Sequence, residues 1–92
     1  AKELGAKGIR VNAVCPVYIE TPGLLVALKN PDAPPKGQKT VKYLEEFTAV
    51  NTALQRLPKG SEVADLCFYL ASPLASAITG QCINADCGVL PQ

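Results

Sequence analysis

Histidine, tryptophan and methionine are absent from this sequence of 92 residues, and its aromatic residues are three tyrosines and two phenylalanines. Without histidine, the chain lacks the side chain most often used for proton transfer near neutral pH and for binding transition metals. The four cysteines include no CxxC pair, so a zinc site would require all four thiolates at irregular spacings. We therefore expect no metal site. Because no secretory signal opens the sequence, we interpret the cysteines as structural or buried free thiols, with a metal site or a disulfide as the alternatives.

The chain also lacks an excess of either charge, with nine Lys and Arg residues against eight Asp and Glu residues. The basic residues are scattered, which excludes the electrostatic surface that nucleic-acid binding requires. No apolar run approaches the roughly 20 residues of a membrane-spanning helix, and no lipidation motif ends the chain. We therefore expect no nucleic-acid or membrane partner, and a cytoplasmic location.

The first residues predict a helix that has no start signal. Residues 1–4 favour a helix, but no capping side chain or turn precedes them. Gly8 is a suitable helix end. We interpret residues 1–7 as the end of a longer helix.

Hydrophobic periodicity predicts the other elements. Apolar residues that alternate and then become continuous over 9–14 indicate a strand that passes from partial to full burial and is ended by Pro16. Thr21 and Ser61 are the expected N-caps of two helices. The predicted elements are strands at 9–14 and 81–85, helices at 21–28, 40–53 and 61–71, and a polar, proline-rich loop at 31–39.

This order of elements predicts a parallel α/β sheet, because strands separated by helices are joined by right-handed crossovers. Two strands are too few for a sheet that is stable alone. A chain of this length also buries only about 60–65% of its unfolded surface. We therefore expect the remaining strands of the sheet to come from elsewhere.

Three segments resemble one protein family in order and spacing. The family is that of the short-chain dehydrogenases/reductases. The first segment is similar to the family's sixth strand and the loop after it, the second to the helix before the last strand, and the third to the last strand and the residues that follow it. The matching residues are 8–16 with 19–22, then 57–58 with 62–65 and 70–72, and finally 78–88. The chain resembles the C-terminal segment of that family nearly everywhere outside 23–56.

The resemblance implies an α/β fold that is the C-terminal part of a Rossmann-like doubly wound parallel sheet, with its last two strands, last helices and substrate-binding lid. Residues 1–92 would be the C-terminal part of a single NAD(P)-binding domain, and residues 23–56 the substrate-binding loop or lid. The implied activity is hydride transfer between a nicotinamide cofactor, NAD or NADP, and a small-molecule alcohol or ketone. The family also implies a homodimer or homotetramer.

The same resemblance assigns the cofactor contacts to the loop after the first strand. The backbone around Pro16 and Val17 would line the nicotinamide ring, the Ile19 N–H would meet its carboxamide, and the Thr21 hydroxyl would bond that group. Val17 and Cys87 stand where the family usually has glycine. From the residues alone Thr21 is a helix N-cap, and one hydroxyl could serve both roles.

Apolar side chains of the lid predict a substrate wall. Leu24, Leu25 and Phe47 are expected to line it, which favours a small hydrophobic or cyclic substrate. Two polar residues are expected to be structural instead. Asn12 would tie the first strand to a neighbouring loop, and Asp86 would bond backbone donors after the last strand.

No residue of the chain is a candidate catalyst. The family's catalytic tyrosine is followed four residues later by a lysine, and none of Tyr18, Tyr43 and Tyr69 meets this condition. The seven glycines form no phosphate-binding turn. We therefore expect the segment to be inactive alone and to require a missing N-terminal portion or a companion chain. The alternative is a non-catalytic packing or oligomerisation module, in which Tyr69 and Phe68 face a partner.

Overall fold

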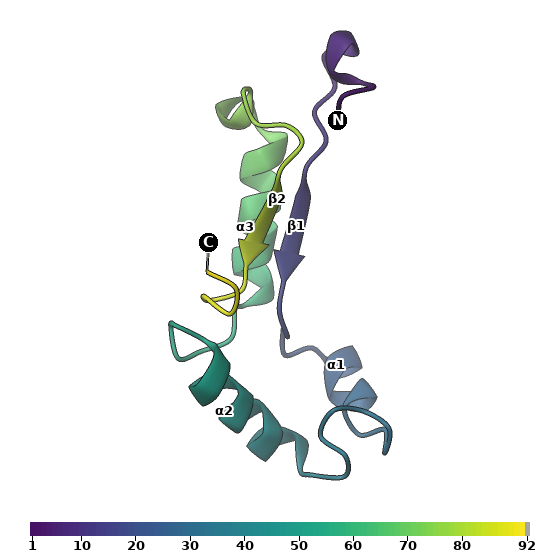
Figure 1. Ribbon diagram of the computed structural model, residues 1–92, viewed down its shortest axis with the longest axis vertical. Helices are drawn as coiled ribbons and strands as arrows, with labels where there is room; N and C mark the ends of the chain where they lie inside the picture. The colour runs from purple at the N-terminus through teal and green to yellow at the C-terminus, as the bar shows by residue number, and fades with distance from the viewer. Residues whose placement is uncertain (92) are drawn as a thin grey trace.

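Two parallel strands form the centre of the structure, a computed structural model that describes residues 1–91 (Figure 1). In chain order the elements are the 3-10 turn η1 (Gly5–Lys7), β1 (Ala13–Pro16), α1 (Pro22–Ala27), α2 (Thr40–Asn51), α3 (Gly60–Ala71), the 3-10 turn η2 (Pro73–Ala75) and β2 (Cys82–Ala85). Helix α3 lies along the two strands, whereas α1 and α2 lie beyond their carboxyl ends (Figure 1). The α/β order and the parallel pairing agree with the prediction.

Because of the register of β1 and β2, the segments that follow the two strands start at the same edge of the sheet. Ala13 lies opposite Cys82, and Pro16 lies opposite Ala85. Proline has no N–H to donate, which suits it to the last position of the strand. Because the strands are parallel, the loop after β1 and the turn after β2 leave from the same edge, on the side of α1 and α2 (Figure 1).

The predicted burial of the first strand is wrong. Within β1 only Val14 is half-buried, and upstream Ile9 and Val11 are 46% and 43% exposed. The strand also begins at Ala13 rather than at residue 9. Residues 1–91 supply only two strands and one helix packed against them, so much of the sheet has no neighbour to cover it.

Side chains from the segment before β1 hold the turn that leads into β2. The Asn12 amide donates to the Ile78 carbonyl at 3.0 Å and accepts from the Gln81 N–H at 3.1 Å. The Arg10 guanidinium donates to the same Ile78 carbonyl at 3.1 Å. The predicted structural role of Asn12 is therefore confirmed, and these bonds help to fix the register of the parallel pair.

The predicted opening helix is also wrong. Residues 1–7 form a turn followed by η1, which ends at Gly8 with a φ of +73°. No residue of η1 is buried, and a short helix without a packing partner is only marginally stable. Gly8 nevertheless adopts the left-handed conformation expected of a helix end.

The start of α3 differs from the prediction as well. The helix begins at Gly60, so Ser61 lies inside its first turn and is not the N-cap. The Glu62 carboxylate instead accepts from the Lys59 N–H at 2.8 Å and forms an ion pair with Arg56 at 2.7 Å. A carboxylate in the first turn thus satisfies the backbone donor and complements the helix dipole. The predicted end before Pro73 is confirmed.

The chain after α2 is fixed to the exit of β2. The Leu54 N–H donates to the Cys87 carbonyl at 3.0 Å. The Asp86 carboxylate accepts from the N–H groups of Gly88 at 3.0 Å and Leu90 at 2.9 Å. The predicted role of Asp86 is confirmed, and α2 ends two residues before the predicted end at residue 53 because the chain turns here.

Gly88 lies where the chain after α2 packs most closely against the exit of β2. Its φ is +85°, and a Cβ atom there would lie 2.5 Å from the Cβ of Ala53. We expect Gly88→Ala to lower the free energy of unfolding by more than about 1 kcal/mol, because it adds a clash to a disfavoured backbone conformation. Urea unfolding followed by circular dichroism measures the change. Gly5→Ala, where a Cβ would meet nothing within 4 Å, is the control, and equal effects of the two substitutions would contradict this explanation.

The Arg56–Glu62 pair makes stability depend on pH. The hydrogen bond from Arg56, and then that from the Lys59 N–H, lower the pKa of Glu62 from 4.5 to about 2. The stabilisation is therefore complete above about pH 4.5 and is lost as the pH falls towards 2. We expect the melting temperature of Glu62→Gln to fall less steeply over this interval than that of the unaltered chain. Glu3→Gln removes a carboxylate that forms no ion pair within residues 1–91 and should leave the slope unchanged.

Candidate cofactor and substrate groove

A groove of about 690 Å³ opens at the carboxyl end of β1. Its walls come from the loop after β1, the first turn of α1 and one position of α2, and its lining residues are Pro16, Val17, Tyr18, Ile19, Thr21, Leu24 and Phe47. Open α/β sheets bind ligands at the carboxyl ends of their strands. The structure thus brings together every residue predicted to contact the cofactor, and two of those predicted to contact the substrate.

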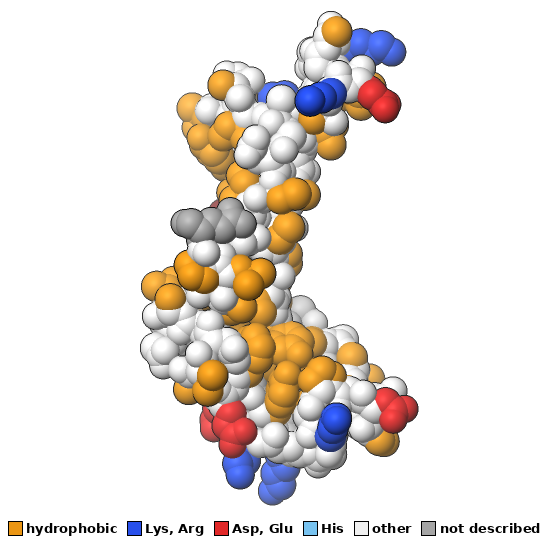
Figure 2. Space-filling view, in the orientation of Figure 1, with side chains coloured by type: hydrophobic (Ala, Val, Ile, Leu, Met, Phe, Trp, Pro, Cys, Tyr) orange, Lys and Arg blue, Asp and Glu red, His pale blue; other side chains and the backbone are white. Residues whose placement is uncertain are grey.

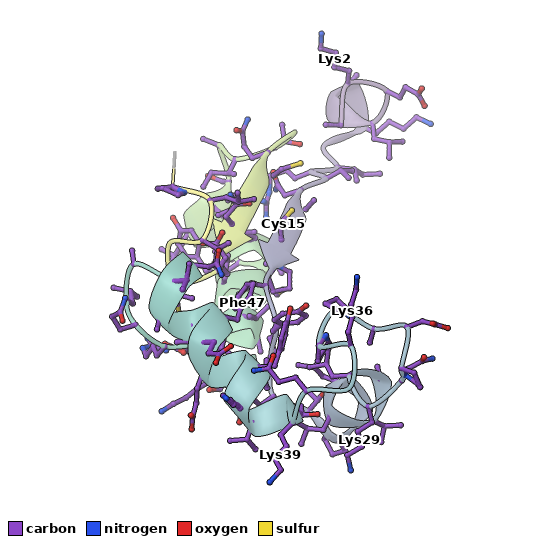
Figure 3. All side chains as sticks on the ribbon, turned by 60° about the horizontal axis from the view of Figure 1, so that its bottom comes forward. Lys2, Cys15, Lys29, Lys36, Lys39 and Phe47 are labelled. Carbon is purple, nitrogen blue, oxygen red and sulfur yellow. The ribbon has the colours of Figure 1, made fainter. Side chains whose placement is uncertain are left out.

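The surroundings of the groove are apolar. Hydrophobic side chains gather on the surface between α1 and α2, and the charged side chains lie towards the outer edge of this region (Figure 2). Phe47 lies on the side of α2 that faces the strands, whereas Lys29, Lys36 and Lys39 point in different directions around the connection between the helices (Figure 3). An apolar wall of this kind suits a largely uncharged ligand.

Thr21 is the N-cap of α1, as its position in the sequence predicts. Its hydroxyl oxygen accepts from the Leu24 N–H at 3.1 Å. A hydroxyl has two acceptor lone pairs and one donor hydrogen, so this bond leaves a lone pair and the hydrogen for a second partner. Thr21 is exposed to solvent, and a ligand in the groove can therefore reach it.

The backbone of the loop after β1 also fits an amide ligand. The N–H of Ile19 donates no hydrogen bond within residues 1–91, and it lies in the same loop as the Thr21 hydroxyl. No positive φ occurs at Val17, so valine replaces the family's glycine there without backbone strain. Cys87, by contrast, has a φ of +54°, a conformation that costs a non-glycine residue about 1–2 kcal/mol.

Three aromatic side chains meet beside the groove, and we call Tyr18, Tyr43 and Phe47 the aromatic corner. The Tyr18 ring lies 4.9 Å from that of Phe47 with an interplanar angle of 63°, and 6.0 Å from that of Tyr43 at 68°. The hydroxyls of Tyr18 and Tyr43 are hydrogen-bonded at 3.0 Å. This bond and partial burial raise the pKa of Tyr43 to about 12.

Two residues differ from the predicted site. Leu25 does not line the groove, because it follows Leu24 directly and one residue turns a helix by about 100°. Tyr18 lines the groove, although from the sequence we test it only as a catalytic tyrosine. Its place between Val17 and Ile19, both predicted contacts, was a signal that could have found it.

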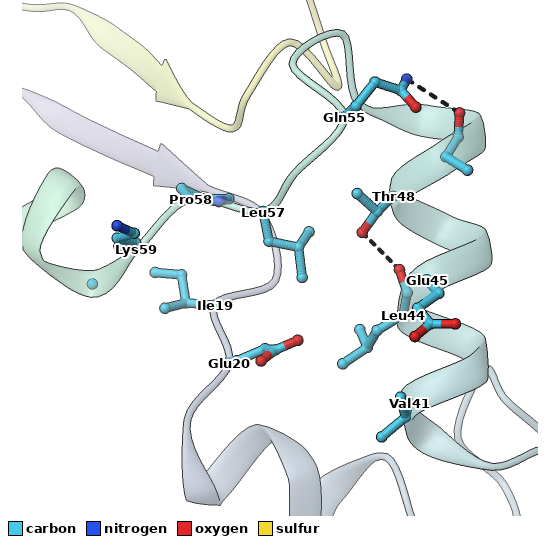
Figure 4. A pocket seen from close by; sticks show the side chains of 12 residues that line it. Ile19, Glu20, Val41, Leu44, Glu45, Thr48, Gln55, Leu57, Pro58 and Lys59 are labelled. Carbon is cyan, nitrogen blue, oxygen red and sulfur yellow. Dashed lines mark hydrogen bonds between the residues drawn. The ribbon is translucent and has the colours of Figure 1, made fainter.

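A second hollow of about 640 Å³ lies between α2, the loop after β1 and the segment before α3 (Figure 4). It shares only Ile19 with the groove. Two polar side chains at its wall are bonded within the protein, since the Thr48 hydroxyl donates to the Leu44 carbonyl at 2.6 Å and the Gln55 amide donates to the Ala49 and Thr52 carbonyls. The carboxylates of Glu20 and Glu45 line it as well. We assign no ligand to this hollow.

The described residues supply neither a metal site nor a catalytic tyrosine–lysine pair. No three His, Cys, Asp or Glu side chains within residues 1–91 are grouped as metal ligands. Tyr18 and Tyr43 bond each other, and Tyr69 lies on α3. In the same part of the chain, no helix has the length and apolar character needed to cross a membrane. No lysine is among the residues that line the groove, so residues 1–91 form no tyrosine–lysine pair in it.

The family model described as Enoyl-(Acyl carrier protein) reductase matches residues 1–90. The chain belongs to the short-chain dehydrogenase/reductase family and corresponds to its C-terminal segment. Its fold likewise matches the C-terminal part of the family's Rossmann fold.

Individual relatives agree with this assignment. The 3-oxoacyl-(acyl-carrier-protein) reductase FabG of Thermotoga maritima is 40% identical, over 98% of this chain and 31% of the relative. Galactitol 2-dehydrogenase of Rhizobium johnstonii is 36% identical, over 96% of this chain and 30% of the relative. The chain therefore spans about a third of the length of the curated relatives it matches.

Solved structures give the same result. A variant of actinorhodin polyketide ketoreductase with NADPH superposes with a TM-score of 0.82 at 33% identity, over 99% of this chain and 34% of that one. YwfH, an NADPH-dependent reductase involved in bacilysin biosynthesis, superposes with a TM-score of 0.80 at 32% identity, over 99% and 34% of the two chains. The chain is thus related to NAD(P)-dependent reductases of this family.

Proposed function

We propose that this chain is the segment of an NAD(P)-dependent oxidoreductase that holds the nicotinamide ring and the substrate, and that the whole protein transfers hydride between that ring and an alcohol or ketone. The observation that carries the proposal is the groove at the carboxyl end of β1, where a backbone donor and a hydroxyl stand beside an apolar wall. The groove favours neither NAD nor NADP, because that choice is made at the adenosine ribose of the cofactor.

Each cofactor contact has a defined role in this proposal. The backbone at Pro16 and Val17 lies along the nicotinamide ring. The Ile19 N–H donates to the carboxamide oxygen, and the second lone pair of the Thr21 hydroxyl accepts from the carboxamide nitrogen. An amide group needs both kinds of partner, and this loop supplies both.

The reaction also needs a proton. A reduced nicotinamide held by this loop would supply the hydride for the carbonyl carbon of a ketone, and the carbonyl oxygen would take up a proton to give the alcohol. Leu24 and Phe47 supply apolar surface beside this step. The proposal places the proton donor in another part of the protein, because none of Tyr18, Tyr43 and Tyr69 is followed four residues later by a lysine. We expect an N-terminal portion or a companion chain to provide it, so that the segment alone is inactive.

The proposal assigns residues 23–56, which include α1 and α2, as the substrate-binding lid. It treats the chain as part of a single NAD(P)-binding domain. It further assigns the whole protein to the cytoplasm, as a homodimer or homotetramer.

The test uses a completed protein, in which this chain replaces the matching segment of the Thermotoga maritima reductase. Circular dichroism and gel filtration establish that it folds, and oxidation of NADPH or NADH with assorted ketones measures activity. We expect dinucleotide binding and ketone-dependent oxidation. A well-folded completed protein that binds neither dinucleotide would refute the proposal.

In the completed protein, the portion from the Thermotoga maritima reductase binds the phosphates of the cofactor. Substitutions of Thr21 therefore test the contribution of this segment to cofactor binding. Glycine keeps most of the capping energy of an N-cap but has no hydroxyl. We expect Thr21→Gly to weaken NADPH binding by roughly two- to tenfold, the effect of one lost hydrogen bond, with little change in melting temperature. Thr21→Ser keeps the hydroxyl and is the control. Equal NADPH affinity in both variants, measured by fluorescence titration, would restrict Thr21 to its capping role.

A second candidate function is that of a non-catalytic packing or oligomerisation module. It is favoured by the exposure of Phe68 and Leu74, which are 79% and 81% accessible. The intact masses of the polypeptides in the purified protein separate the two functions. A companion polypeptide of roughly twice the mass of this chain supports the enzyme, whereas this chain alone in a stable oligomer supports the module.

A further inference from the structure

We infer that the groove selects substrates that carry a flat ring, and that Tyr43 is the positioning residue for this selectivity. The inference rests on the proposed function, because it assigns the substrate to the same groove. Its basis is the aromatic corner, in which two members line the groove and the third holds them from outside it.

The two lining rings form a steep corner. The ring centroids of Tyr18 and Phe47 are 4.9 Å apart, and the ring planes meet at 63°. A planar ring that enters such a corner can lie parallel to one face and present its edge to the other, and both arrangements are favourable for aromatic pairs. A saturated ring or an alkyl chain of equal size fills the same space without these contacts. The corner therefore discriminates by flatness as well as by size.

The corner is adjacent to the proposed nicotinamide contacts. Tyr18 follows Val17 and precedes Ile19 in the chain, and all three line one groove of about 690 Å³. Pockets of this size accommodate small organic ligands. A substrate whose carbonyl is attached directly to a flat ring can therefore place the ring in the corner while its carbonyl stays near the cofactor loop.

Tyr43 acts through Tyr18 and not on the ligand. It does not line the groove, but its hydroxyl is bonded to that of Tyr18 at 3.0 Å, and the two rings meet edge to face. The bond links the cofactor loop to α2, which also carries Phe47. Without it, the angle between the two lining rings is no longer held. Removing a single oxygen at Tyr43 should therefore change selectivity more than affinity for the cofactor.

The test compares three methyl ketones whose other substituent is phenyl, cyclohexyl or n-hexyl, so that the carbon count is constant. Rates are measured with the completed protein. Each variant is judged by the change in its ratio of kcat/KM values relative to the unmutated completed protein, because the intrinsic reactivity of each ketone cancels in that comparison. We expect Phe47→Leu to lower the phenyl-to-hexyl ratio by roughly three- to tenfold, the effect of a lost aromatic pair. Tyr43→Phe should lower it by roughly two- to fivefold. NADPH affinity should not change in either variant.

Tyr69→Phe on α3 removes a tyrosine hydroxyl outside the groove and should leave all three rates unchanged. Selection by flatness is overturned if the phenyl-to-hexyl ratio is unaltered in both variants. It is also overturned if kcat/KM falls as much for the cyclohexyl ketone as for the phenyl ketone. In both cases the proposed function stands. Failure of the unmutated completed protein to bind NADPH or NADH counts instead against the proposed function. If Phe47→Leu does not fold, Tyr43→Phe, which retains the ring, decides the question.

Discussion

The parallel pairing of β1 with β2 is the constraint on which the rest of the structure depends. Each strand has only four residues, and a sheet of two strands is marginal by itself. Side chains therefore reinforce it at both ends. Asn12 and Arg10 hold the entrance to β2, while Asp86 holds its exit. This double reinforcement places the loop after β1 at the edge where ligands of α/β sheets bind.

The groove depends in turn on two attachments of the helical segment that contains α1 and α2. One is the hydroxyl pair of Tyr18 and Tyr43, and the other is the Leu54–Cys87 backbone bond next to Gly88. The first sets the side of α2 that faces the groove, and the second fixes the end of that helix. The loop after β1 and the apolar wall are therefore aligned by contacts that lie mostly outside the groove itself.

The parts of the structure that could be predicted are those decided by local chemistry. An amide or carboxylate that is shielded from water next to an apolar strand must find hydrogen-bond partners, so the structural roles of Asn12 and Asp86 were predictable. Thr21 before a proline is a strong helix start. The burial of β1 was not predictable in this way, because it depends on neighbours that residues 1–91 do not supply. The hydrogen bond between Tyr18 and Tyr43 was not predictable either, because the two residues are 25 positions apart, beyond any helical or strand period.

The connection between α1 and α2 has a consequence for changes in the length of the chain. Lys36 and Gly37 both have positive φ values, 49° and 86°, and both are exposed. Neither takes part in the two attachments. Exposed loop tips of this kind accept insertions and deletions with little cost to the remaining fold. This tip can therefore be lengthened or shortened without disturbing the groove at the carboxyl end of β1.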